Sequence, residues 1–251
     1  MSFQARNLNL PMKTLFTLFF TLLFVGVSIA QDDIAKLPGQ PEEREIADFD
    51  HIKVMGNFQV LLKKSDKNKI VIENKDGVNA DVTFVTEIDK NGILNVSIDG
   101  DMGGKGTDSM KVTIYYKNII GVDARRGAWL KFEDKIEGDS LTFEVASGGH
   151  ILAEIESRSV YAATSKAGEI KLWGKSTNAH YNVFAGGEIY AFKLDSEDIW
   201  GKIRTGGYLN VTGKNILDVT IFSGGTCNYK GEPKAPNLVK KIAGNFRKIR
   251  S

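Results

Sequence analysis

The fold is decided by the stretch Phe184-Ala185-Gly186-Gly187-Glu188-Ile189-Tyr190-Ala191, a small-residue corner followed by a short alternating run. Similar corners, each a pair of Gly or Ala residues, return about every 19 residues between Arg126 and Ile249. Their second residues are Ala128, Gly149, Gly168, Gly187, Gly207, Gly225 and Gly244. Fixed self-similarity of this kind indicates a repeat architecture, in which each unit buries its apolar face against its neighbours.

The residues around each corner follow the period of a strand. Counted from the second corner residue, position +2 holds Leu130, Ile151, Ile170, Ile189, Leu209, Cys227 and Phe246. Position −4 holds Ala124, Val145, Thr164, Val183, Ile203 and Ile221. Positions +4 and −6 are also mainly apolar, so the apolar columns are two residues apart and share one face of a pleated ribbon. Each unit is therefore expected to be two short strands, one leaving the corner and one returning to the next.

Glycine suits such a corner because a sharp bend requires a positive φ or a close backbone approach. The alternative is a meander whose glycine pairs are hairpin turns. Hairpin turns in sandwiches and barrels recur every 8–12 residues or so, about half the interval seen here. The pattern favours an all-β fold, a β-solenoid of about 19 residues per repeat.

The first 30 residues are typical of a secretory signal peptide. A short basic start at Met12-Lys13-Thr14 precedes the apolar run 15–27, and Ser28-Ile29-Ala30 provides a small-residue cleavage site. Met12 is an alternative initiator to Met1. A membrane anchor is the competing interpretation, but the run is too short to span a bilayer comfortably. We therefore expect export to the periplasm, the outer surface or the medium, with no membrane span after cleavage.

The mature chain is nearly neutral. Of 33 Lys and Arg residues, Arg6 and Lys13 leave with the signal peptide, and 31 acidic residues balance the remaining 31 basic ones. Without an overall basic excess, the sequence gives no sign of a nucleic-acid partner. The single cysteine, Cys227, excludes an intramolecular disulfide, and its inward column predicts a buried thiol.

The sequence before the regular repeats divides into two parts. Residues 31–45 contain Pro38, Pro41 and alternating charges, which predict a flexible tether. Residues 46–120 form an irregular β region that we expect to cap the stack and protect its first strand edge. The expected strands are 51–55, 58–63, 69–73, 82–87, 93–98 and 110–116, with turns at Lys75-Asp76-Gly77 and Asn91-Gly92 and a loop over 100–109. Regular repeats fill 121–249, and 46–249 is expected to be one continuous domain.

A family resemblance rests on three features. These are the opening Phe49-Asp50-His51-Ile52-Lys53-Val54-Met55-Gly56-Asn57-Phe58-Gln59-Val60, the Asn91-Gly92 hairpin followed by Val112-Thr113-Ile114-Tyr115-Tyr116, and the serial glycine corners. Over residues 46–249 the chain resembles the head GIN domain family of putative auto-transporter adhesins, a domain of unknown function in secreted Bacteroidetes proteins. The resemblance implies a single-stranded, right-handed β-helix-like solenoid and an adhesive role. The family's usual Ser-Gly-Ser-Gly-Asp corner is replaced here, for example by Gly-Gly-His150, which argues against a family-wide acidic ladder.

Two outward columns offer candidate sites. Position +1 stacks His150, Glu169 and Glu188 at the strand spacing of about 4.8 Å, which could hold a metal ion. We favour an exposed column whose carboxylates point into water. The second candidate is an aromatic surface of Trp173, Tyr190 and Phe192, with Trp173 and Phe192 one repeat apart. Such rings can bind a glycan or a surface protein, unless another segment covers them.

No pattern of catalytic residues or cofactor-binding motif accompanies these columns, so we expect no catalytic site and no cofactor. The preferred function is a secreted, noncatalytic adhesin or binding protein of the cell envelope. One alternative is a pectinase-type carbohydrate-active enzyme, for which Asp195, Asp198 and Arg204 are the nearest candidates. The other is a purely structural envelope component.

Overall fold

The computed structural model describes residues 41–74, 83–99 and 110–250, all of which fall within one compact unit, Pro38–Ser251. The expected signal peptide, residues 31–40 of the tether, the Lys75-Asp76-Gly77 turn and the 100–109 loop lie outside these residues. The described ranges contain strands and no helix, and therefore no helix long and apolar enough to cross a membrane. The strands are β1 (Glu42–Glu45), β2 (His51–Met55), β3 (Gln59–Lys64), β4 (Lys69–Asn74), β5 (Thr83–Ile88), β6 (Ile93–Asp99), β7 (Met110–Tyr116), β8 (Gly121–Arg125), β9 (Trp129–Phe132), β10 (Ile136–Ala146), β11 (His150–Ser165), β12 (Glu169–Phe184), β13 (Glu188–Arg204), β14 (Tyr208–Lys230) and β15 (Ala235–Lys248).

The C-terminal strands stack as parallel coils. From β10 to β15 each strand pairs in parallel with the next in the sequence. His150 lies opposite Glu169, and Glu169 opposite Glu188, so one coil is one repeat. The predicted β-solenoid is confirmed. The expectation that each repeat contains two short strands is wrong in one respect. Most coils contain a single strand of 16 residues or more, because the chain bends at the polar turn without losing its pairing.

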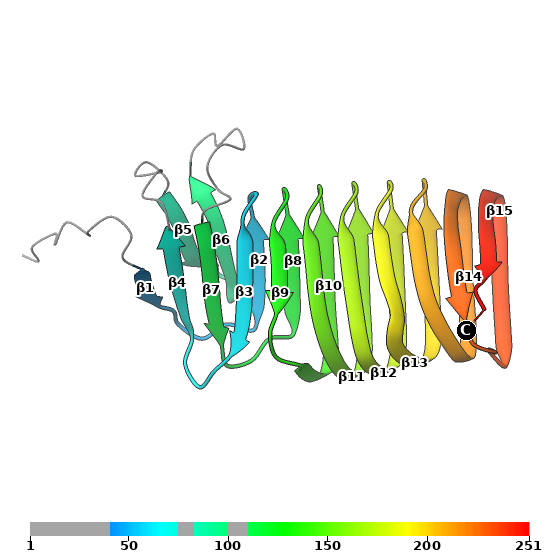
Figure 1. Cartoon of the computed structure of the whole chain (residues 1–251), viewed down its shortest axis with the longest axis horizontal. Helices are drawn as coiled ribbons and strands as arrows, with labels where there is room; N and C mark the ends of the chain where they lie inside the picture. The colour runs from blue at the N-terminus through cyan, green and yellow to red at the C-terminus, as the bar shows by residue number, and fades with distance from the viewer. Residues whose placement is uncertain (1–40, 75–82, 100–109, 251) are drawn as a thin grey trace, which may run out of the picture. The chain divides into compact units, whose positions relative to one another are not determined.

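The coils make two layers (Figure 1). One layer contains β4, β7, β3, β9 and the first halves of β11 to β14, and its outer side is called the leaving face. The other contains β5, β6, β2, β8, β10 and the second halves of the long strands, and its outer side is called the returning face. Apolar side chains from both layers fill the space between them.

The N-terminal region extends the solenoid as well as ending it. Strand β2 pairs in parallel with β8, and β3 pairs in parallel with β9, so residues 51–64 form a further coil with Gly56 at its corner. Strands β6 and β7 continue the two layers in parallel with β2 and β3. Among the described strands, the antiparallel pairs are β1 with β4, β4 with β7, and β5 with β6. The Asn91-Gly92 turn joins the antiparallel pair β5 and β6, as expected from the sequence.

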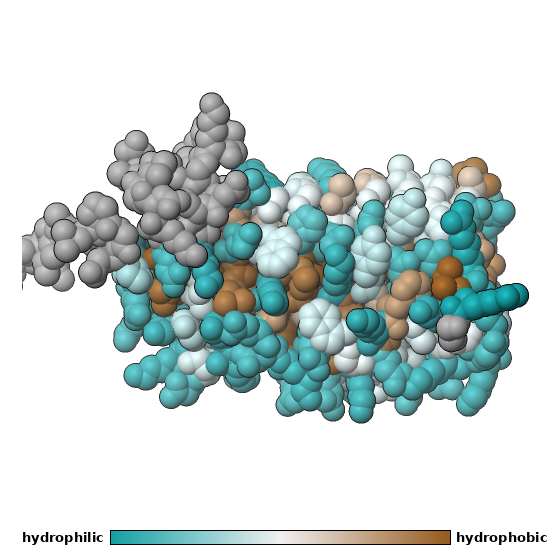
Figure 2. Space-filling model, viewed as in Figure 1, coloured by the Kyte–Doolittle hydropathy of each residue, from teal (hydrophilic) through white to brown (hydrophobic). Residues whose placement is uncertain are grey.

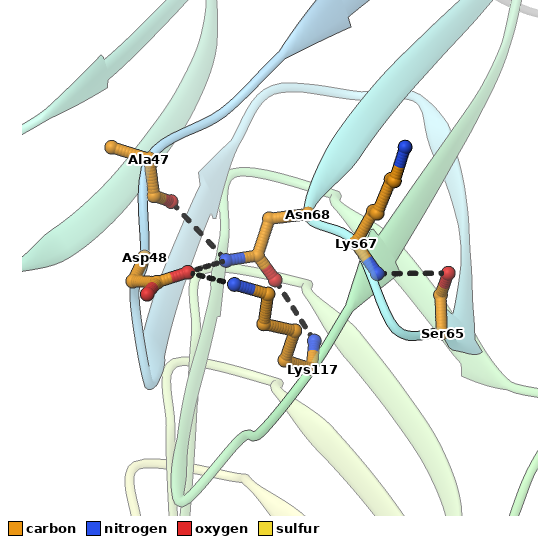
Figure 3. A network of polar contacts seen from close by, with 6 residues as sticks. All are labelled: Ala47, Asp48, Ser65, Lys67, Asn68 and Lys117. Carbon is orange, nitrogen blue, oxygen red and sulfur yellow. Dashed lines mark hydrogen bonds and ion pairs between the residues drawn. The ribbon is translucent and has the colours of Figure 1, made fainter.

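Two polar anchors hold the beginning of the described chain. Residues 42–45, expected in the tether, instead form β1 beside β4. The Arg44 guanidinium fixes this strand by donating to the Phe84 carbonyl at 2.7 Å. Behind it, the buried Asn68 side chain donates to the Ala47 carbonyl and accepts from the Lys117 backbone N–H at 2.8 Å (Figure 3). A polar side chain thus ties three segments together at this end of the stack.

At the Gly186-Gly187 corner the two glycines are required for different reasons. Gly186 has a φ of 76°, in the left-handed region, and a Cβ there would meet nothing within 4 Å. Gly187 has no positive φ, but a Cβ there would lie 2.4 Å from Thr164 Oγ1 in the preceding coil. At this corner the first position is governed by backbone conformation and the second by close approach between coils, whereas Gly207 and Gly225, also second residues, combine a positive φ with close approach.

The core alternates in size from coil to coil. Phe132 and Phe143 occupy one coil, while Ala153 and Ala162 occupy the equivalent positions in the next. Leu172 and Tyr181 are large again, and Ala191 and Gly201 small. Large side chains can therefore extend over small ones in the neighbouring coil, which keeps the density of the core high.

Candidate functional site

The predicted aromatic surface lies on the leaving face, but it does not form a continuous platform. Trp173, Tyr190 and Phe192 are all half-buried. A register shift between Lys171 and Trp173 places Trp173 opposite Lys193, one residue beyond the expected Phe192. The expected stack of Trp173 on Phe192 is therefore wrong, because β13 accommodates an extra residue at this point.

Each of these rings has a charged neighbour instead. Trp173 Nε1–H donates to Glu154 Oε2 at 3.1 Å. The Lys230 ammonium lies 5.0 Å from the centre of the Phe192 ring, and the Tyr190 hydroxyl donates to the Glu188 carboxylate. Figure 2 shows that hydrophilic side chains cover most of the leaving face, with hydrophobic residues visible only in small separate areas.

The His150, Glu169 and Glu188 column has the expected register. Its carboxylates, however, are already engaged, because Glu169 accepts Lys171 Nζ at 2.8 Å and Glu188 accepts the Tyr190 hydroxyl. The hydrogen bond to this carboxylate raises the pKa of Tyr190 to about 12. In the part of the chain that the structure describes, no three His, Cys, Asp or Glu residues are placed to hold a metal ion.

The returning face carries a different arrangement, a regular grid on β11 to β14. One row along the solenoid axis contains Tyr161, His180, Trp200 and Asp218. A second row contains Ala163, Asn182, Lys202 and Thr220. A third contains Ser165, Phe184, Arg204 and Phe222. The order follows from the parallel register, because alternate residues of each strand point to the same face.

The grid forms a groove along the axis. Two adjoining hollows lie on this face, and Asn182 and Arg204 line both of them. The first extends from Met55 on β2 to Arg204 on β13, and the second, about 440 Å³ in volume, extends to Thr220 on β14. We call the two hollows together the axial groove. It crosses seven neighbouring strands, namely β2, β8, β10, β11, β12, β13 and β14. At about 4.8 Å between neighbouring strands, it is roughly 29 Å long.

Aromatic rings form one side of the axial groove. His180 and Trp200 are stacked, with ring centres 4.7 Å apart and planes 10° from parallel. Tyr161 lies in register with His180 on the adjacent strand and is 39% exposed. Phe184, 44% exposed, stands on the opposite side of the groove. The facing sides of His180 and Trp200 cover each other, so this pair offers a ligand mainly the ring edges, which carry the ring nitrogens.

Charged and polar groups complete the lining. Lys202 and Arg204 follow Trp200 at alternate positions of β13, and Arg126 and Lys166 line the groove near the corners. The Arg204 guanidinium lies 5.2 Å from the centre of the Phe222 ring. Between the two sides, Asn182 contributes an amide whose oxygen is buried and has no hydrogen-bond partner among the described residues. The groove can thus contact rings, hydroxyl groups and anions.

The pectinase-type candidates do not form a comparable cluster. Asp195 pairs with Lys214, and Asp198 accepts a hydrogen bond from the Ile216 backbone N–H at 3.2 Å. Arg204 instead lines the axial groove. The three side chains therefore have separate partners rather than a common centre.

Sequence reasoning missed the axial groove although its signal was present. Tyr161, His180 and Trp200 share one outward repeat position, seven residues before the second corner residue. Neither of the two outward columns identified from the sequence includes that position. A search of every column for aromatic residues would have found the row.

Comparisons with known proteins support the fold. Residues 48–233 match the family described as "Putative auto-transporter adhesin, head GIN domain". Among curated proteins, none is similar enough to count as a match.

Solved structures of similar proteins cover most of the chain. A putative adhesin from Bacteroides fragilis NCTC 9343 has a TM-score of 0.73 and 21% identity, covering 84% of this chain and 96% of that one. A putative adhesin from Parabacteroides merdae ATCC 43184 has a TM-score of 0.64 and 19% identity, covering 84% and 95%. A putative lipid binding protein from Parabacteroides distasonis ATCC 8503 has a TM-score of 0.59 and 20% identity, covering 84% and 98%. At these identities the likeness establishes a shared fold.

Proposed function

The chain belongs to the putative auto-transporter adhesin, head GIN domain family, and we propose that it is an exported, noncatalytic binding protein that holds an extended ligand in the axial groove. The observation that carries this proposal is the row of Tyr161, His180 and Trp200 on three successive strands. Rings repeated along an axis suit a ligand that itself repeats along that axis.

Export and a role in the cell envelope are supported by the N-terminal sequence. The basic start at Lys13, the apolar run 15–27 and the small residues ending at Ala30 are typical of a secretory signal peptide. Adhesion also requires that the groove meet its ligand outside the cytoplasm. The proposed location is the periplasm, the outer surface or the medium.

A noncatalytic role is favoured by the composition of the groove. Its lining consists mainly of rings, amides, hydroxyls and cations, with Glu144 and Asp218 as its acidic residues. Glu144 lies 3.8 Å from the Arg125 guanidinium, within an ion-pair cluster that includes Asp123. Glycoside hydrolysis usually requires two carboxyl groups flanking one bond, and a groove dominated by rings and cations is better suited to binding.

The proposal is tested with the mature protein, residues 31–251, on an array of glycans and polyuronates that records both binding and release of reducing ends. We expect binding without turnover. Trp200→Ala should weaken binding at least about tenfold, because a ring at the centre of an interface contributes strongly. Tyr208→Ala is the matched control, since Tyr208 is a 48% exposed ring on the leaving face.

The possible results separate the three functions. Turnover of a polymer would establish the enzyme. The absence of any binding partner on the array would favour the structural component. Binding that survives Trp200→Ala and is lost in Tyr208→Ala would place the site on the leaving face and refute the axial groove.

A further inference from the structure

We propose that the ligand of the axial groove is an acidic polysaccharide rich in uronic acids, bound with its chain along the solenoid axis. This inference rests on the proposed function and specifies its ligand. It combines three observations on the returning face, namely the spacing of the rings, the excess of cations and the polar side chains between the two sides.

The spacing of the rings suits a sugar polymer. Neighbouring strands are about 4.8 Å apart, which is comparable with the length of one pyranose residue in an extended chain. Tyr161, His180 and Trp200 therefore present one ring to each successive sugar. Because His180 and Trp200 cover each other's faces, a sugar chain along the axis would meet the ring edges, whose nitrogens can hydrogen-bond its hydroxyl groups.

The polar side chains between the rows can bind those hydroxyl groups. Asn182 and Thr220 belong to the second row of the grid, which lies between the row of Tyr161, His180 and Trp200 and the row that contains Arg204. An amide and a hydroxyl can each donate and accept hydrogen bonds, which matches the hydroxyl groups of a sugar. Ala163 in the same row is small and leaves room for the chain.

The charge of the groove favours carboxylates on the ligand. The cations that line it are Arg125, Arg126, Lys166, Lys202 and Arg204, against Glu144 and Asp218. Arg125 is neutralised by Asp123, with Arg125 Nη2 and Asp123 Oδ2 2.8 Å apart, and lies near Glu144. Arg126, Lys166, Lys202 and Arg204 remain, and Lys202 and Arg204 are on the same strand as Trp200. A uronate beside the edge of the Trp200 ring would place its carboxylate near these two cations.

The experiment compares two polymers with the same sugar backbone, one carrying carboxylates and the other neutral methyl esters. Binding of polygalacturonate and of fully methyl-esterified polygalacturonate is measured by calorimetry with the mature protein at low and high salt. We expect the acidic polymer to bind at least about tenfold more tightly at low salt, and this preference to shrink as salt screens the charges. Single-stranded poly-dT serves as a third probe, because it also combines flat rings with negative charge.

Two double variants assign the preference to the groove. Lys202→Ala with Arg204→Ala should weaken binding of the acidic polymer far more than binding of the methyl ester, and so remove most of the preference. Lys111→Ala with Lys131→Ala is the control, since it removes the same charge from exposed residues of β7 and β9 on the leaving face. The control should keep the wild-type preference. Thermal unfolding of all variants verifies that they remain folded.

Several outcomes would overturn the inference. Equal binding of the two polymers would show that charge is not recognised, yet the proposed function would stand if Trp200→Ala still abolished binding. Tighter binding of poly-dT, or no binding of either polygalacturonate, would identify the wrong ligand class. Loss of the preference in the leaving-face control would place the site elsewhere, and unchanged binding in Trp200→Ala would refute the groove itself.

Discussion

The rings of His180 and Trp200 stack face to face on adjacent strands, with their centres 4.7 Å apart. This distance equals the spacing between hydrogen-bonded strands, so the sheet itself sets the separation of the rings. Two aromatic residues in the same column of a parallel solenoid therefore stack without any dedicated support. This stacking depends on strict register. On the leaving face a one-residue shift separates Trp173 from Phe192, and the two rings are not opposite each other.

The two corner glycines should respond differently to alanine. Gly186→Ala should lower the free energy of unfolding by about 1 kcal/mol, because it places a Cβ in the left-handed region but in open space. Gly187→Ala should cost more, about 2–3 kcal/mol, because its Cβ would overlap Thr164 in the preceding coil. Urea unfolding of the two variants provides the measurement. A greater loss in Gly186→Ala would show that backbone conformation, rather than approach between coils, dominates the corner.

Asn68 should be important for the N-terminal end of the stack. Its replacement by alanine removes the acceptor of the Lys117 N–H and a donor to the Ala47 carbonyl (Figure 3). We expect a loss of about 2 kcal/mol in the free energy of unfolding, because buried polar groups lose their partners. Lys67→Ala is the control, since the Lys67 side chain is exposed and its backbone N–H bond to Ser65 would remain. Equal unfolding midpoints for the two variants would contradict this role.

Much of the fold was predictable because the same pattern of apolar residues and small-residue corners recurs in successive repeats. The inward columns containing Ile151, Ile170 and Ile189 lie in the core as expected. Strands β2 and β7 have the predicted bounds, since alternation and flanking turns mark both clearly. The corners were predicted to require positive φ or close approach, and the structure shows the two causes on different residues at Gly186-Gly187 and together on Gly207 and Gly225.

The functional surface was less predictable because it depends on register. The sequence places Trp173 and Phe192 one repeat apart, but an extra residue in β13 separates them, and no local signal marks that bulge. The strand β1 was missed because Glu42-Glu43-Arg44-Glu45 is fully charged. It is held by long-range contacts such as that of Arg44 with Phe84. Short-range patterns do not report contacts of this kind.

Cys227 should be chemically inert in the native protein. It is completely buried, and burial raises the pKa of its thiol to about 12. A thiol reagent at pH 8 should therefore label it only in denaturant, since the reactive thiolate is scarce and inaccessible. Deletion of residues 235–251 removes Phe246, its opposite residue on β15, and should accelerate labelling. Rapid labelling of the intact folded protein would contradict the inward position of this column.

The same thiol makes a contribution to the pH dependence of stability. The unfolded thiol ionises near pH 8.5, whereas the folded thiol keeps its proton until about pH 12. Its contribution is complete below pH 8.5 and is lost as the pH rises towards 12, because the unfolded state then releases a proton that the folded state retains. Over that range the free energy of unfolding should fall by about 1.4 kcal/mol per pH unit for this one group. Cys227→Ala should show a correspondingly shallower fall in urea midpoints measured between pH 8.5 and 10.5, and identical slopes would refute the assignment.

The last prediction concerns Trp173, whose neighbours differ from those its sequence position suggests. Trp173→Ala should lower the free energy of unfolding by only about 1 kcal/mol, because the ring is half-buried and makes one side-chain hydrogen bond, to Glu154. Phe143→Ala, in the core and 1% exposed, should cost about 3–5 kcal/mol and serves as the comparison. Double-mutant cycles then test the register directly. Coupling of about 0.5 kcal/mol or more is expected between Trp173 and Glu154, and none between Trp173 and Phe192. Coupling to Phe192 instead would restore the aromatic pair on the leaving face, and a loss in Trp173→Ala as large as that in Phe143→Ala would show that another segment covers the ring.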